Sequence, residues 1–197
     1  MRRLSFIVMC SLVSLMGACA TPASMRLHTL LQADGSGLPA APKLVIALAA
    51  VTLPVQVDQP QWLLRQADGS LLTLEQERWA APLRDEFRAA LLQGLGVTAG
   101  AIEQRQASAE ATWRLQLEVT QFESQAGVHA TLEALWFLAP ARTAEMPGVT
   151  CATRLREPVA EGAAALAAGH ARNVRTLATQ IARALQARQA GQAFDCR

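Results

Sequence analysis

The chain has 197 residues, of which 51% are hydrophobic, so it is long and apolar enough to fold as one domain with a packed core. Its formal net charge is only +2, and without Arg2 and Arg3 the 18 basic side chains fall to 16, which equals the 16 acidic ones. Because proteins that bind nucleic acid usually have a basic excess, this balance argues against a nucleic-acid partner.

The N-terminus has the pattern of a secretory signal. Arg2 and Arg3 precede an apolar stretch, Leu4–Leu15, which is shorter than the roughly 20 residues that a bilayer span needs. Small residues then lead to Cys19. We therefore predict a signal peptide over residues 1–18 and a single periplasmic domain over residues 19–197.

The sequence Leu-Met-Gly-Ala-Cys at residues 15–19 resembles the lipobox of bacterial lipoproteins. The resemblance implies a diacylglycerol on the Cys19 sulfur, cleavage before Cys19, and acylation of the new amino group by a fatty acid such as palmitate. Ala20 follows, not Asp, which by analogy with known sorting rules favours the periplasmic face of the outer membrane. Residues 21–24 would form a short polar tether. An ordinary signal peptide with a coincidental cysteine is the alternative.

Two cysteines remain for the mature domain, Cys151 and Cys196. The periplasm is oxidising, so we expect a disulfide between them that ties the C-terminus to the domain. A buried free Cys151 with a frayed Cys196 is the alternative. A metal site is disfavoured, because two thiols without a nearby histidine make a poor ligand set, and no cofactor is expected.

Seven stretches after the tether are predicted to be strands. Lys43–Leu53 is a near-continuous apolar run typical of a buried central strand, ended by the following proline, and Asp34–Pro42 before it has the composition of a loop. Thr112–Phe122 alternates between apolar and polar residues, and Asp68-Gly69 between two apolar runs predicts a hairpin. In chain order the predicted strands are Met25–Leu31, Lys43–Leu53, Gln61–Gln66, Ser70–Leu74, Thr112–Phe122, Val128–Leu138 and Val149–Arg156.

Two helices are predicted from apolar residues three to four positions apart. The first begins near Ala80, with Pro82 in its first turn, and Gly94 and Gly96 are expected to end it. The second runs from about residue 159 to 188. The two stripes consist of Trp79, Leu83, Phe87, Leu91 and Leu95 in the first helix, and of Leu166, His170, Val174, Leu177, Ile181 and Leu185 in the second.

The order of these elements predicts an α/β protein of the α+β kind. Strands that follow one another as hairpins favour a mostly antiparallel mixed sheet, with the two main helices packed on one face. A parallel doubly wound fold is disfavoured, because strands and helices do not alternate regularly.

Three stretches together point to a family. Val51–Pro54 is followed by Asp58–Gln61, Arg78–Leu83 reads Arg-Trp-Ala-Ala-Pro-Leu, and the strand Leu115–Phe122 comes next. In this combination the chain resembles the PqiC-type ABC-transport auxiliary lipoproteins, also called the membrane integrity-associated transporter subunit family. The similarity extends from about residue 25 to 186. Val57 and Gln59 depart from the family, which often has an aromatic residue and an arginine there.

The resemblance implies a function. Lipoproteins of this family sit at the outer membrane, partner MCE-type proteins that span the periplasm, and support the movement of lipid between the two membranes without binding ATP themselves. We therefore expect a non-enzymatic subunit, acting as a homo-oligomer next to outer-membrane lipid. The alternative is a structural lipoprotein that assists insertion of outer-membrane proteins or lipopolysaccharide. A hydrolase is disfavoured, because no nucleophile–base pair is apparent in the sequence.

Candidate binding residues lie in one predicted loop. Asp58 is expected to form a turn, and Gln61 and Trp62 are expected to be exposed, so we predict that these three residues contact a partner. Trp79 could also anchor a partner, but its place on the apolar stripe favours packing in the core. His170 lies on the apolar stripe of the second helix and is expected to be half-buried.

Overall fold

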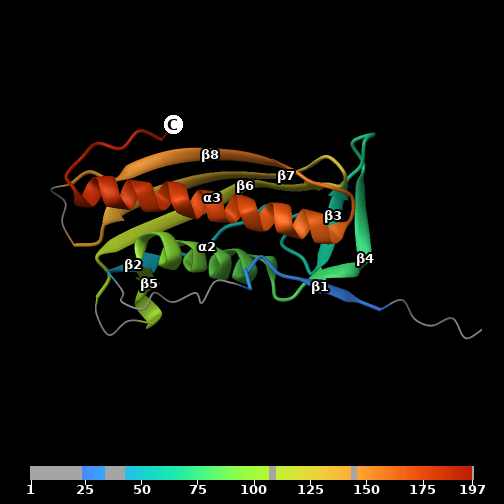
Figure 1. The fold of residues 1–197 in the computed structure, drawn as a ribbon, viewed down its shortest axis with the longest axis horizontal. Coiled ribbons are helices and arrows are strands. Elements are labelled where there is room, and N and C mark those ends of the chain that lie inside the picture. The colour runs from blue at the N-terminus through green and yellow to red at the C-terminus, as the bar shows by residue number, and fades with distance from the viewer. Residues whose placement is uncertain (1–23, 34–42, 107–109, 143–145, 197) are drawn as a thin grey trace, which may run out of the picture.

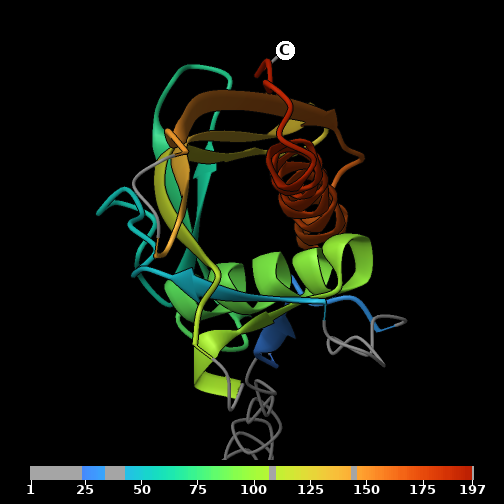
Figure 2. The ribbon, with the colours of Figure 1, turned by 90° about the vertical axis from the view of Figure 1, so that its left-hand side faces the viewer.

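The computed structural model describes residues 24–33, 43–106, 110–142 and 146–196 (Figure 1). Within these ranges eight strands form one mixed sheet, and two long helices pack against it, so the predicted α+β class is confirmed. The sheet curls round the two helices, which lie side by side in its concave side (Figure 2). The predicted signal peptide, Cys19 and the predicted loop Asp34–Pro42 fall outside the described residues.

The longest strands are neighbours in both sequence and space. They are β6 (Trp113–Gln125), β7 (His129–Pro140) and β8 (Val149–Pro158), each antiparallel to the next. Buried and exposed residues alternate along the first part of β6, as its sequence predicts. This meander provides the broad sheet surface on which the second long helix packs.

Parallel pairing joins the short strands to this meander. β2 (Leu44–Leu48) lies between β5 (Ala101–Glu103) and β6, and β1 (Arg26–His28) pairs with the end of the strand β4 described below. β2 ends at Leu48, whereas the apolar run predicted a strand to Leu53. β5 was not predicted, because three residues are too few to show a periodic pattern.

The predicted hairpin forms between β3 (Gln61–Arg65) and β4 (Leu71–Trp79). At its turn Gly69 adopts a φ of 86°, a left-handed conformation that glycine adopts without strain. The Ser70 hydroxyl donates to the Asp68 carboxylate over 2.7 Å, and the Ser70 amide donates over 2.9 Å. These hydrogen bonds stabilise the charged form and lower the pKa of Asp68.

The first helix begins later than predicted. β4 continues to Trp79, so this residue ends a strand and does not lie at the head of a helix, although it is buried in the core as expected. Pro82 is the N-cap of α2 (Leu83–Ala99). A proline suits this position because the first amides of a helix need no partner within the helix.

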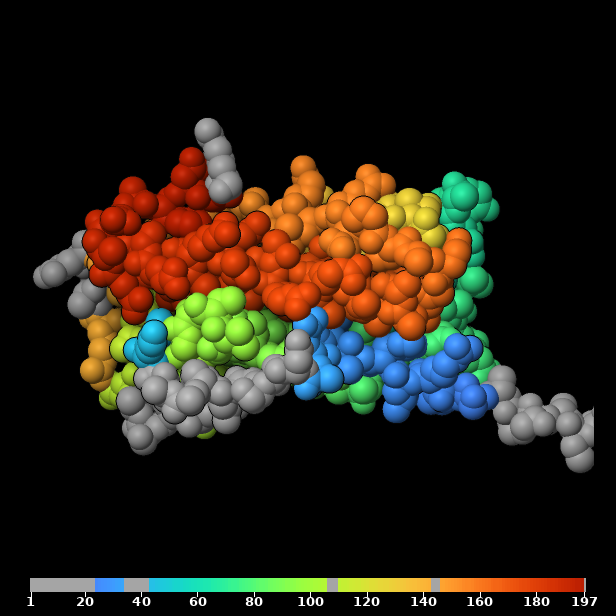
Figure 3. Space-filling model, viewed as in Figure 1, coloured from blue at the N-terminus to red at the C-terminus, as the bar shows by residue number. Residues whose placement is uncertain are grey.

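The predicted end of this helix was wrong as well. α2 passes Gly94 and Gly96 and ends at Ala99, where Gly100 takes up the left-handed conformation at φ 63°. A Cβ at Gly94 would lie only 2.6 Å from the Cβ of Ala178 in α3 (Ala163–Gln189). Gly94 therefore allows the two helices to approach each other closely. Figure 3 shows α3 lying across α2 and the N-terminal segment on one face of the molecule.

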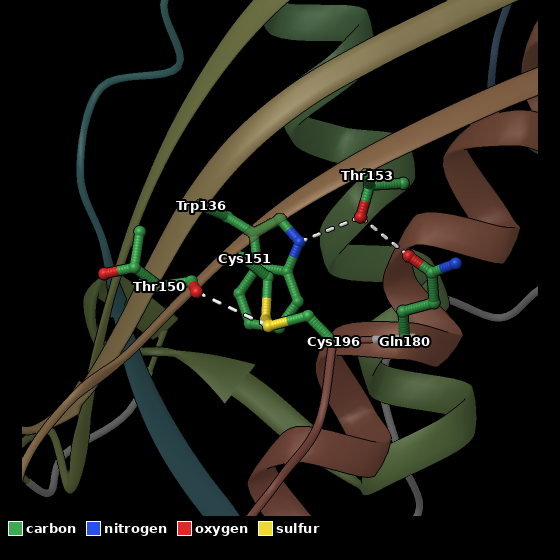
Figure 4. The surroundings of a disulfide bond; sticks show 6 residues. All are labelled: Trp136, Thr150, Cys151, Thr153, Gln180 and Cys196. Carbon is green, nitrogen blue, oxygen red and sulfur yellow. Dashed lines mark hydrogen bonds between the residues drawn. A yellow bond between two sulfur atoms is a disulfide. The ribbon is translucent and has the colours of Figure 1, made fainter.

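The C-terminal tail is attached to β8 (Figure 4). Cys151 of β8 and Cys196 are joined by a disulfide, with their Cα atoms 5.5 Å apart. Next to it the indole nitrogen of Trp136 donates to the Thr153 hydroxyl over 3.0 Å, and that hydroxyl donates to the side chain of Gln180 over 2.7 Å. The disulfide and this chain of hydrogen bonds connect the tail, the meander and α3.

Candidate partner-binding site

The loop before β3, residues 54–60, is held in place at both of its ends. The amides of Val57 and Asp58 both donate to the carbonyl oxygen of Pro54, over 3.1 and 3.3 Å, and so close a turn. The Asp58 carboxylate forms an ion pair with Arg84 in the first turn of α2. Asp58 thus has the turn position that the sequence predicted, and its charge links the loop to the helix. Between these contacts Val55 projects outward with 90% of its surface exposed.

The expectation that Trp62 is exposed was wrong. Only 2% of this residue is accessible, because β3 directs the indole into the core against Trp79, with ring centroids 4.4 Å apart. His28 of β1 also packs against this indole, with ring centroids 5.1 Å apart. Gln61 is half-buried beside an irregularity in the pairing of β3 with β4. Trp62 therefore supports the loop from beneath and offers no surface to a partner.

A groove of about 160 Å³ opens between this loop and the hairpin. β3 and β6 are paired only at Leu64 and Ser124, and the groove lies beside this junction. Arg65 of β3 and Glu123 of β6 form an ion pair there, over 2.9 Å. We call this the loop–hairpin groove; its lining residues are Pro54, Gln56, Val57, Leu63, Arg65, Leu71 and Thr120–Glu123.

The outer half of the hairpin leaves apolar side chains and backbone groups exposed. Leu71 and Leu72 are 49% and 45% accessible. β1 pairs with β4 only from Glu77 to Trp79, so in the described part of the chain residues 71–76 have a neighbouring strand on one side only. An unpaired edge with exposed leucines is a surface that can bind another chain.

One pair of residues that the sequence did not reveal comes together in the core. The Ser124 hydroxyl and Nε2 of His170 are 2.8 Å apart, and the imidazole stacks on Phe122 with ring centroids 3.9 Å apart. A serine 46 residues from a histidine gives no signal in the sequence, so only the structure reveals this contact.

The surroundings of this pair favour a structural role. His170 is completely buried, not half-buried as expected, and burial lowers its pKa to about 3, so its ring is neutral at physiological pH. Ser124 is buried as well, so a substrate has no access to its hydroxyl. Among the described residues Nδ1 of His170 meets no partner that would orient the ring, as the third member of a catalytic triad does.

The buried carboxylates are also bound within the fold. Glu77 contacts Arg26 and His28, and Glu86 accepts hydrogen bonds from Thr29 and Leu30, while Glu103 forms an ion pair with Arg88. No group of three or more potential metal ligands occurs in the ranges that the structure describes. None of the helices there has the length and apolar character needed to cross a bilayer.

Comparison with known proteins identifies relatives of this fold. An uncharacterized protein of known structure superimposes with a TM-score of 0.67 at 15% identity, covering 82% of this chain and 99% of its own. A protein from Xanthomonas campestris superimposes with a TM-score of 0.62 at 18% identity, covering 87% of this chain and 100% of its own. At such identities these structures show the shared fold alone.

At the level of sequence, none of the curated proteins matches the chain. The profile of one family, the ABC-type transport auxiliary lipoprotein component, matches residues 28–182. This range extends from β1 into α3 and includes the loop–hairpin groove. Because the match spans most of the 197 residues, the chain belongs to the ABC-type transport auxiliary lipoprotein family.

Proposed function

We propose that this protein is a non-enzymatic subunit of an MCE-type lipid-transport system, anchored through Cys19 to the periplasmic face of the outer membrane. Membership of a transport auxiliary lipoprotein family is the observation that carries this proposal. The lipobox-like sequence at residues 15–19 supports the anchor, and Ala20 after the cysteine supports the outer membrane as its location.

Such a subunit acts by binding and position. The Ser124–His170 pair is sealed in the core, and the buried carboxylates are engaged in contacts within the fold. The loop–hairpin groove, in contrast, is open to solvent, and the half-exposed Leu71 lines it. The exposed Leu71 and the Arg65–Glu123 pair in its lining suit a protein surface, because protein interfaces combine apolar anchors with a few polar contacts. We assign the MCE-type partner to this groove.

The free edge of the hairpin suggests how copies of the subunit associate. Residues 71–76 of β4 can pair with a strand of a second copy, and Leu72 would be covered by such a contact. The opposite edge of the sheet, β8, carries Arg154, Arg156 and Pro158, which discourage pairing with another strand. A homo-oligomer in which the β4 edges of two copies pair would bring two loop–hairpin grooves to one partner.

Crosslinking in native membranes tests the function. The acylated protein, purified from crosslinked membranes of its own host, should carry an MCE-type protein as its principal partner, identified by mass spectrometry. If the principal partner were instead a factor for outer-membrane protein or lipopolysaccharide insertion, the transport proposal would be replaced by the alternative of an envelope assembly lipoprotein.

The anchor is tested separately on the mature N-terminus. Mass spectrometry should find Cys19 as the first residue, with acyl chains on its sulfur and its amino group, and Cys19→Ala should yield protein without acyl chains. An unmodified Cys19, or cleavage at another position, would overturn the anchor.

A further inference from the structure

Exposed apolar side chains gather around the N-terminal segment of the structure. They are Met25, Leu27, Leu31 and Val97, each between 43% and 70% accessible, and we call them the β1 surface. A groove of about 150 Å³ connects the segment to α2, lined by Leu30, Gln32, Val97 and Arg175 among others. In Figure 3 the N-terminal segment lies beside α2 and beneath α3 on the same face of the molecule.

This segment is fixed to the body of the protein. The Glu86 carboxylate accepts hydrogen bonds from the Thr29 hydroxyl over 2.6 Å and from the Leu30 amide over 2.9 Å. The backbone of Gln32 exchanges two hydrogen bonds of 3.0 Å with the side chain of Gln93 on α2. In β1, Arg26 and His28 both contact Glu77, so Leu27 between them faces the other way. The exposed apolar residues therefore belong to a segment, β1 and the residues after it, that is held firmly to the body of the protein.

The tether limits how far this segment can lie from the anchor. Five residues separate Cys19 from Met25, and at about 3.3–3.6 Å per residue step the six steps between the two Cα atoms span at most about 22 Å. A lipid anchor at Cys19 would thus keep Met25, directly before β1, within about 22 Å of the bilayer surface. β1 lies at one end of the long axis of the molecule, together with β3 and β4, so the anchor would hold this end nearest the membrane (Figure 1).

A positive charge near the β1 surface complements a phospholipid surface. Arg175 is exposed at the border of the groove, whereas Arg26, on the other side of β1 from Leu27, forms an ion pair with Glu77. Apolar side chains flanked by cations are the combination that binds at the boundary between anionic headgroups and acyl chains.

From the exposed apolar side chains, the neighbouring Arg175 and the short tether, we infer that the β1 surface lies against the phospholipid headgroups of the membrane that holds the anchor. This inference rests on the proposed acylation of Cys19. It orients the molecule: the membrane meets β1 and the side of α2 that carries Val97, while Val55 and the loop–hairpin groove remain free for a protein partner.

A fluorophore attached to single cysteines tests this orientation. In the acylated protein Cys19 carries lipid and Cys151 is bonded to Cys196, so a cysteine introduced by Val97→Cys would be the free thiol available for labelling. Val55→Cys is the matched control, because it is also an exposed valine, and Leu27→Cys provides a second position should the first variant fold poorly. The labelled proteins are incorporated into phosphatidylethanolamine–phosphatidylglycerol vesicles that contain a spin-labelled lipid, and only floated protein is measured.

We expect the lipid quencher to reduce the fluorescence at position 97, and at position 27, by roughly threefold or more relative to position 55. Equal quenching at all positions in floated protein would overturn the orientation while leaving the anchor intact. Protein that does not float with the vesicles would overturn the anchor and this inference together. Strong quenching at 97, with no MCE-type partner found in native membranes, would retain the orientation and reject the transport function.

Discussion

The meander with α3 and the loop–hairpin region differ in how they bury their apolar residues. In the meander, Leu132 of β7 and Leu177 of α3 are completely covered, and the Cys151–Cys196 disulfide holds the tail against β8. In the loop–hairpin region, Val55 and Leu71 are exposed, and part of β4 lacks a second neighbouring strand.

This difference separates stability from recognition. A leucine covered by a helix contributes to folding, while a leucine left in water on a fixed hairpin is available to another molecule. The boundary between the two regions runs through β3, where Trp62 packs into the core and Arg65, three residues later, lines the groove. Variants on either side of this boundary should therefore have different effects.

The largest expected effect is at the base of the hairpin. Trp62→Ala should lower the free energy of unfolding by roughly 3–5 kcal/mol, because it removes a fully buried aromatic ring that packs on Trp79. Leu71→Ala, farther out on the same hairpin, should change it by less than about 0.5 kcal/mol. Urea unfolding of both variants measures the two effects. A stable Trp62→Ala protein would mean that the hairpin folds independently of the core.

Loss of the disulfide should have the second-largest effect on stability. The loop it closes spans 45 residues, and the chain-entropy model gives at most about 4 kcal/mol for a loop of this length. Cys196→Ser should therefore lower Tm, and reduction of the wild-type protein should have the same effect. Reduction of the Cys196→Ser variant is the control and should cause no further change. Free alkylation of both thiols in protein from the periplasm would contradict the bond itself.

Acid should weaken the core through His170. Its pKa is about 3 in the folded protein against an ordinary value of 6.5, so between these values the unfolded chain binds a proton that the folded protein excludes. The corresponding stability is present above about pH 6.5 and is lost as the pH falls toward 3, which amounts to about 2 kcal/mol between pH 7.5 and 5. Burial and, to a smaller extent, the positive charge of Arg156 also lower the pKa of His129, so protonation of this residue should likewise destabilise the folded protein as the pH falls.

Urea unfolding at the two pH values measures this loss, and His170→Gln is the matched variant. Its amide can accept a hydrogen bond from Ser124 but does not titrate, so the pH dependence should become smaller by about the same 2 kcal/mol. An unchanged pH dependence in His170→Gln would show that the imidazole binds a proton as readily in the folded protein as in the unfolded chain.

The sequence predicted the meander well and the site poorly, for physical reasons. Alternation in Thr112–Phe122 and the Asp68-Gly69 turn are local signals, and each produced the strand or hairpin that it predicted. Gly94 was wrongly predicted to end the first helix. A glycine lies there because the helix packs closely against Ala178, on a helix far along the chain, and a local pattern does not reveal that contact. The burial of Trp62 and its contact with Trp79 depend on how β3, β4 and β1 pair. The alternation of residues within one strand does not reveal that pairing.

The central claim, that the loop–hairpin groove binds the partner while the meander supports it, depends on one comparison of affinities. Leu71→Glu places a charge in the groove, and Leu135→Glu places the same charge on the outer side of β7, at a leucine with 45% exposure against 49%. Both variants should unfold at nearly the wild-type Tm, because neither leucine belongs to the core. Binding of each acylated variant to the purified MCE-type partner is then measured. We expect Leu71→Glu to weaken binding by roughly tenfold or more, the effect of about 1.4 kcal/mol, and Leu135→Glu to bind as the wild type does. Wild-type affinity in Leu71→Glu, or an equal loss in both variants, would contradict the assignment of the groove.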